Sequence, residues 1–202
     1  MDGLMFGKAP LKPEQLDLFN NPSFRTTLRQ EPLVMDADTL RLWKARIFDY
    51  QRQVSQSQPP KQETLFELAC LGISGAHVDP DTIDPFGLLL QPMSFWRKPT
   101  FDLGQACLYF VIDNADPLLL LYTGESAHSS KRWKGTHDAK RYIDKYIALH
   151  RQYGLSPAVS IAFWFDAPVE RKARQQLELA LILRWRSPFN KENWQLWGQP
   201  FG

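Results

Sequence analysis

The second half of the chain carries side chains whose types and order suit the hydrolysis of a phosphodiester. That reaction needs an activated water, neutralisation of the charge that develops on the phosphoryl oxygens, and stabilisation of the leaving group. Tyrosine and histidine can move a proton, arginine can neutralise phosphate, and a carboxylate can hold a metal ion. The candidate residues are Tyr109, Tyr122, Arg132, His137, Glu178 and Asn190.

Glu178 is the candidate metal ligand. It stands between Leu177 and Leu179, and a carboxylate buried among apolar residues is costly unless it is paired or bound to a metal. We therefore predict that it binds one Mg²⁺ or Mn²⁺ ion whose other ligands are water and phosphate. The alternative is an ion pair with Arg174, one helical turn earlier.

Arg132 is predicted to hold the scissile phosphate through its planar guanidinium, unless it is a solvated helix charge. The general base is open between Tyr109, Tyr122 and His137. A tyrosine has a pKa of about 10 in water, which a nearby metal ion and arginine would lower. The tyrosines can also be plain core residues, and His137 a proton shuttle. Asn190 positions a loop or a phosphate, or is a turn residue.

The elements that carry these residues read as a small α+β domain. Hydrophobic patterning and turn residues predict an antiparallel or mixed sheet flanked by helices, in the order β-β-α-β-α. The expected strands are 107–113, 118–122 and 158–165, and the expected helices are 136–153 and 168–185.

The first half reads as an extension of this domain. Residues 1–35 are rich in proline and predicted to be irregular. Residues 36–104 form a helical and proline-rich extension, with a helix from Asp36 to about Val54, a loop over 51–62, a short helix over 64–71 and irregular chain over 72–100. Residues 105–202 form the catalytic domain in this division.

The motifs of the second half resemble those of the GIY-YIG nuclease family over about residues 107–190. The first motif reads Cys107-Leu108-Tyr109 and the second reads Tyr122-Thr123-Gly124. The remaining motifs are RWKGTHD with Arg132 and His137, QQLELALI with Glu178, and SPFN with Asn190. The resemblance implies a divalent-metal-dependent DNA endonuclease with these residues in its active site and Glu178 on the metal.

Two departures keep other functions open. Cys107 replaces the first glycine of the family's first motif, and Thr123 replaces the isoleucine of the second. A catalytically inactive DNA-binding module of the same fold is therefore one alternative, and a restriction-type endonuclease is another.

A basic stretch is the predicted DNA-binding surface. Between residues 131 and 151 there are seven Lys or Arg against two Asp, whereas the whole chain carries a net charge of only +2. A local patch of this kind can bind phosphates, although a solvated helix face is the alternative. The predicted DNA contacts are Lys131, Lys134, Lys140, Arg141 and Lys145.

A short peptide near the N-terminus predicts a protein partner. Gln15, Leu16, Asp17, Leu18 and Phe19 resemble, at all five positions, the bacterial peptide that docks on the replicative sliding clamp. Leu18 and Phe19 would enter an apolar pocket while Gln15 makes a polar contact. The resemblance implies a role in replication-linked repair or recombination. The alternative is that this peptide packs on the protein's own core.

The composition of the chain limits the cellular compartments and the classes of protein that fit it. The two cysteines, Cys70 and Cys107, are far apart and give neither a disulfide framework nor a zinc spacing. No apolar run is long enough to span a bilayer, and no glycine-rich nucleotide loop is present. We expect a cytoplasmic, nucleoid-associated protein with no membrane partner.

Overall fold

The computed structural model describes residues 35–57, 78–94, 105–127 and 138–199. All of them belong to one compact unit, Pro32–Gly202. Residues of the first helix and of 78–94 therefore share a core with residues 105–199. The predicted helix over 64–71 lies outside the described residues.

The fold is α+β, as predicted, and the described residues form a sheet of four strands. The strands lie in the order β1 (Leu90–Pro92), β4 (Val159–Trp164), β2 (Cys107–Asp113) and β3 (Leu119–Ser126), and all neighbours are antiparallel. Strand β1 lies in a stretch that the proline-rich pattern predicts to be irregular. Its three residues form a strand only because they pair with β4, so nothing local in the sequence indicates it.

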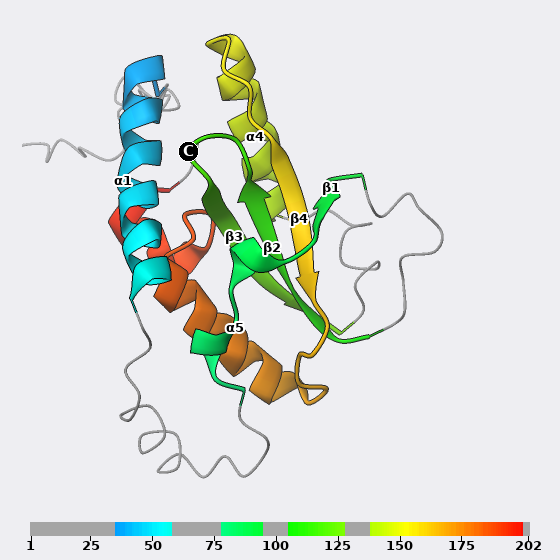
Figure 1. The fold of residues 1–202 in the computed structure, drawn as a ribbon. Coiled ribbons are helices and arrows are strands. Elements are labelled where there is room, and N and C mark those ends of the chain that lie inside the picture. Colours follow the sequence, from blue (N-terminus) through cyan, green and yellow to red (C-terminus); the bar gives the residue numbers. More distant parts are fainter. Residues whose placement is uncertain (1–34, 58–77, 95–104, 128–137, 200–202) are drawn as a thin grey trace, which may run out of the picture. The chain divides into compact units, whose positions relative to one another are not determined.

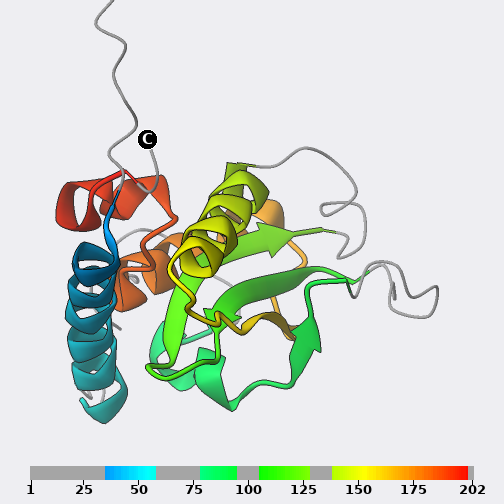
Figure 2. The same ribbon diagram turned by 90° about the horizontal axis from the view of Figure 1, so that it is seen from above.

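Helices cover both faces of the sheet (Figures 1 and 2). Helix α4 (Asp138–Gln152) packs on one face and α5 (Arg171–Trp185) on the other, while α1 (Ala37–Gln56) runs along the β3 edge. The two short 3₁₀ helices Pro80–Thr82 and Pro85–Gly87 precede β1, and a 3₁₀ turn (Lys191–Asn193) leads into the short helix α6 (Trp194–Trp197).

Helix α1 follows from its sequence. The carboxylate of Asp36 accepts the N–H of Thr39 at 2.7 Å and caps the helix. Leu40, Trp43 and Ile47 recur every three or four residues and are all buried, so they form one apolar stripe facing the core.

Strand β2 is the centre of the core, and all seven of its residues are buried. Its side chains alternate between the two faces because successive residues of a strand point in opposite directions. Cys107, Tyr109 and Val111 pack on the side of α1 and α4, whereas Leu108 and Phe110 pack on the side of α5.

A buried polar cluster ties α1 and α4 to the end of β2. The ammonium of Lys44 binds the carboxylate of Asp113 at 3.0 Å, and Tyr146 donates to the same oxygen at 2.6 Å. Nδ1 of His150 lies 2.8 Å from the carbonyl oxygen of Tyr146. Burial works to raise the pKa of Asp113, but the hydrogen bonds from Tyr146 and from the N–H of Ala158, with the charge of Lys44, outweigh it and hold that pKa below its usual value.

Candidate active site

The two motif strands are neighbours in the sheet, and their tyrosines lie on the same face. Tyr109 of β2 is directly opposite Gly124 of β3, and its ring lies against that glycine so closely that any Cβ there would collide with it. The rings of Tyr109 and Tyr122 have centroids 5.9 Å apart. Tyr109 is completely buried, whereas Tyr122 is partly exposed.

Sterics therefore explain why the second motif has a glycine at position 124. A side chain at this position would occupy the space of the Tyr109 phenol, so the pairing of β2 with β3 and the seating of Tyr109 both depend on Gly124. Cys107 and Thr123, the two departures from the family's motifs, are both fully buried in β2 and β3. These residues are therefore compatible with the paired strands.

Glu178 reaches the same strand from α5. Its Oε1 accepts the backbone N–H of Glu125 at 3.0 Å, directly after Gly124. The side chain is half-buried. Glu178 therefore lies at the outer edge of β3, at the residue that follows the motif glycine.

Arg174 pairs with a different carboxylate from the one that its helical spacing suggests. Its Nε binds the carboxylate of Glu125 at 2.6 Å, and one terminal nitrogen donates to the carbonyls of Pro168 and Val169 at 3.0 Å each. The ion pair therefore joins α5 to Glu125 of β3, one turn of helix away from Glu178. Its two partners are largely buried, with side-chain exposures of 3% and 14%.

Asn190 binds β3 through both ends of its amide. Its oxygen accepts the N–H of Thr123 at 3.0 Å and the hydroxyl of Ser187 at 2.7 Å, and its nitrogen donates to the carbonyl of Thr123 at 2.9 Å. The side chain is 4% exposed. This geometry favours positioning of the chain by Asn190 over contact with phosphate.

Several predicted residues lie outside the described part of the chain. They are Arg132 and His137, the basic residues Lys131 and Lys134, and the peptide Gln15–Phe19. The remaining basic residues are on α4, where Lys140 is half-buried and Arg141 and Lys145 are exposed. Since Arg141 and Lys145 are one helical turn apart, they present two cations on one exposed face.

The described residues contain no group of three or more His, Cys, Asp or Glu side chains able to enclose a metal ion. Within the described ranges, Glu178 and Glu125 supply carboxylates near the motif, and Glu125 is engaged by Arg174. This donor set fits an ion that takes a single protein carboxylate and otherwise binds water and substrate, which is the usual habit of Mg²⁺.

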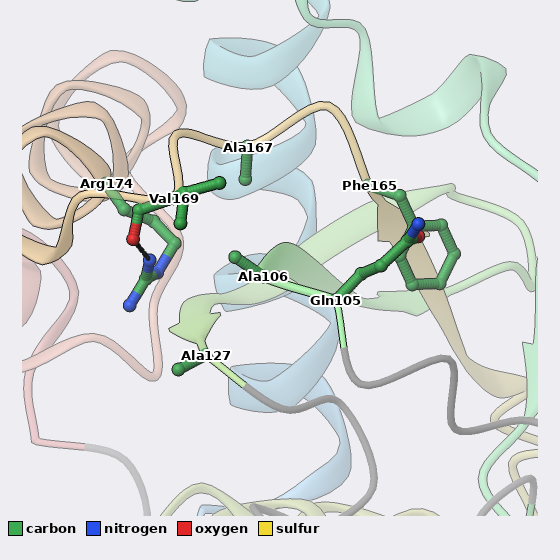
Figure 3. A pocket seen from close by; sticks show the side chains of 7 residues that line it. All are labelled: Gln105, Ala106, Ala127, Phe165, Ala167, Val169 and Arg174. Carbon is green, nitrogen blue, oxygen red and sulfur yellow. Dashed lines mark hydrogen bonds between the residues drawn. The ribbon is translucent and has the colours of Figure 1, made fainter.

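A pocket of about 420 Å³ lies beside Arg174, where β2 begins and β3 and β4 end. Figure 3 shows Arg174 and Val169 on one side and Gln105 and Phe165 on the other. The other residues that line the pocket are three alanines: Ala106, Ala127 and Ala167.

Gln51 is a structural residue that sequence reasoning missed. It falls in a Gln- and Ser-rich stretch whose composition predicts a loop, yet it lies within α1 and is only 1% exposed. Its amide binds the backbone of Leu120 in β3 and the carbonyl of Trp185. No local signal marks it, because its partners are far away in the sequence.

Comparison of the chain with protein-family models, curated proteins and solved structures found no match. No helix within the described ranges is both long and apolar enough to cross a membrane.

Proposed function

We propose that this protein is a DNA endonuclease of the GIY-YIG type, which hydrolyses phosphodiester bonds with one Mg²⁺ or Mn²⁺ ion. The observation that carries the proposal is the seating of the Tyr109 ring on Gly124, with the Tyr122 ring at a centroid distance of 5.9 Å. Residues from both predicted motifs meet at one point of the sheet, and Glu178 is bonded to the next residue of the same strand.

The two tyrosines differ in solvent exposure, which suggests different roles in catalysis. A general base must reach the water or the substrate from which it takes a proton. Tyr122 is partly exposed and Tyr109 is fully buried, so Tyr122 is the better general base and Tyr109 the better support for it. His137 remains the competing base.

Glu178 is the proposed metal ligand. A bound Mg²⁺ or Mn²⁺ ion would neutralise charge on the phosphate and lower the pKa of a bound water. Glu178 suits this task because it is half-buried, and the backbone N–H of Glu125 at 3.0 Å fixes the direction of its carboxylate. Arg132 would complete the site as the phosphate-binding cation.

Substrate and partner follow from the charged stretch and the N-terminal peptide. The exposed cations Arg141 and Lys145 on α4 support DNA binding beside the site. The match of Gln15–Phe19 to the clamp-docking peptide supports recruitment to a bacterial sliding clamp, and so a function in replication-linked repair or recombination.

A cleavage assay tests the proposal directly. Branched, mismatched and linear DNAs are incubated with the protein and Mg²⁺ or Mn²⁺, and products are resolved on denaturing gels. We expect metal-dependent cleavage by the parent and none by Glu178→Gln, which keeps an oxygen for the N–H of Glu125 while removing the charge. The exposed residue Glu192 supplies the matched control, Glu192→Gln, which should cut like the parent.

Two results would contradict the proposal. Cleavage at the parent rate by Glu178→Gln would show that the metal assignment is wrong. Binding of DNA by the parent without cleavage of any substrate would favour the catalytically inactive module of the same fold.

A further inference from the structure

Strand β3 contains a β-bulge immediately before Tyr122. Val111 pairs with Tyr122 but the next residue, Ile112, pairs with Leu120, so Leu121 is an extra residue on the β3 side. Both Leu121 and Tyr122 pack with the core cluster on the side of α1 and α4, whereas Leu120 packs on the side of α5. The regular alternation of the strand is thus interrupted at this point.

The bulge decides which face of the sheet Tyr122 occupies. Successive residues of a regular strand point to opposite faces, so in an uninterrupted strand Tyr122 would share the α5 face with Leu120. One extra residue reverses this, and Tyr122 joins Tyr109 on the opposite face. Bulges near active sites re-aim side chains in this way.

The bulge is held from outside the sheet by two buried side-chain amides. On its N-terminal side, Gln51 of α1 accepts the N–H of Leu120 at 2.9 Å and donates to the Leu120 carbonyl at 2.9 Å. On its C-terminal side, the Asn190 amide makes the same pair of bonds with Thr123, at 3.0 and 2.9 Å.

The bulged residue itself is held by the loop that carries Asn190. The N–H of Phe189 donates to the carbonyl of Leu121 at 2.9 Å. Gln51 donates further to the carbonyl of Trp185 at the end of α5, at 3.1 Å. Gln51 thus connects α1, the bulge and the end of the helix that carries Glu178.

We propose that Gln51 is a positioning residue which, together with Asn190, holds the Leu121 bulge in place and so presents Tyr122 beside Tyr109. The effect on catalysis rests on the proposed function, but the effect on the two rings does not. An edge strand leaves its outer N–H and C=O groups unpaired, and a slip of one residue would move its side chains to the other face. The two amides pair those groups on either side of the bulge and oppose such a slip.

The test uses Gln51→Leu, which has a similar volume and removes the hydrogen bonds of the side chain to Leu120 and Trp185. The matched control is Gln53→Leu, the same change at an exposed position two residues further along α1. The first readout is the set of nuclear Overhauser contacts between the rings of Tyr109 and Tyr122. This measurement does not depend on nuclease activity. The second is cleavage kinetics with kcat and KM separated.

In Gln51→Leu we expect loss of most ring contacts and at least a tenfold fall in kcat, with KM within about twofold of the parent. Gln53→Leu should match the parent in both readouts. Ring contacts in Gln51→Leu equal to those of the parent would overturn the proposal. If the ring contacts change but the parent cuts no DNA, the positioning role stands and the proposed function fails.

If Gln51→Leu does not fold, variants that remove only part of the hydrogen bonding are used instead. Gln51→Glu and Asn190→Asp each retain an acceptor for the strand N–H and lose the donor to the strand carbonyl, so each should show a partial loss of ring contacts. Unchanged contacts in both overturn the proposal. Failure of all three variants to fold also counts against it, since a residue that only orients Tyr122 is not required for folding.

Discussion

The ring of Tyr109 in β2 fills the space that a side chain at Gly124 in β3 would need. The two motif strands are therefore in close contact at the proposed site. Gly124→Ala must therefore displace the ring or part the strands. We expect a loss of about 1–3 kcal/mol in the free energy of unfolding, the usual cost of overpacking a core, and a fall in cleavage.

Urea unfolding of Gly124→Ala checks this expectation. The control is Gly87→Ala, where the added Cβ would lie 3.3 Å from a side-chain oxygen of Asp84, so that this carboxylate would need to shift by only a few tenths of an ångström. Equal stability of the Gly124→Ala and parent proteins would show that the ring adjusts without cost.

Phenylalanine substitutions separate the roles of the two tyrosines. If Tyr122 is the general base, Tyr122→Phe should lose about 3–4 kcal/mol of transition-state stabilisation. Arg132→Ala should lose a similar amount, because Arg132 is the proposed phosphate-binding cation. Tyr109→Phe should lose less, because its ring would still fill the space over Gly124. Single-turnover rates at saturating DNA provide the measurement, and a larger loss in Tyr109→Phe would exchange the two assignments.

The basic face of α4 should control the salt dependence of DNA binding. The logarithm of the affinity for duplex DNA falls with the logarithm of salt concentration, with a slope of roughly −0.9 for each phosphate that the protein neutralises. Replacing Lys140, Arg141 and Lys145 by Gln should make that slope shallower by about 0.9 for each of these cations that binds a phosphate. Arg41→Gln with Arg52→Gln on α1 is the control. A slope unchanged in the α4 variant would show that DNA binds elsewhere.

The buried cluster at the end of β2 predicts a decline in stability on acidification. Nε2 of His150 lies 3.3 Å from the ammonium of Lys44. Burial is the main cause that lowers the pKa of His150, and the charge of Lys44 adds to it, although Asp113 and the Tyr146 carbonyl act in the opposite direction. The folded protein therefore binds a proton at this site less readily than the unfolded chain does.

Stability should therefore fall as pH drops below about 6.5, the ordinary pKa of histidine in an unfolded chain. The contribution of Asp113 persists at these pH values, because its lowered pKa keeps it charged until more acidic conditions. The fall should be shallower in His150→Gln. Urea midpoints between pH 5 and 8 measure it, and parallel curves for the two proteins would remove His150 as the cause.

The N-terminal peptide predicts binding to the bacterial sliding clamp. A short linear peptide loses conformational entropy when it binds, so we expect an affinity on the order of micromolar. Leu18→Ala with Phe19→Ala should abolish it, because paired apolar anchors dominate such docking. Cleavage of naked DNA should not change. Calorimetry against purified clamp is the measurement, and equal binding by both proteins, or by neither, would contradict the proposal.

The sequence by itself determined most of the helices and strands of this fold and the order of its candidate residues. Asp36 caps α1, whose range was predicted from the sequence, and Leu40, Trp43 and Ile47 form its apolar stripe. The predicted strands and helices of the second half are present, although β3 runs four residues beyond its predicted end at Tyr122. Such features are readable because caps and periodicities depend on residues only a few positions apart.

The tertiary structure alone decided how these elements meet. Gln51 lies 69 residues from Leu120, and Asn190 lies 67 residues from Thr123, so no local pattern could reveal that both amides bind β3. The bulge at Leu121 and the pairing of β1 with β4 likewise depend on neighbours in space. Backbone groups on a strand edge bind whichever side chain packing brings to them, and packing is a property of the whole fold.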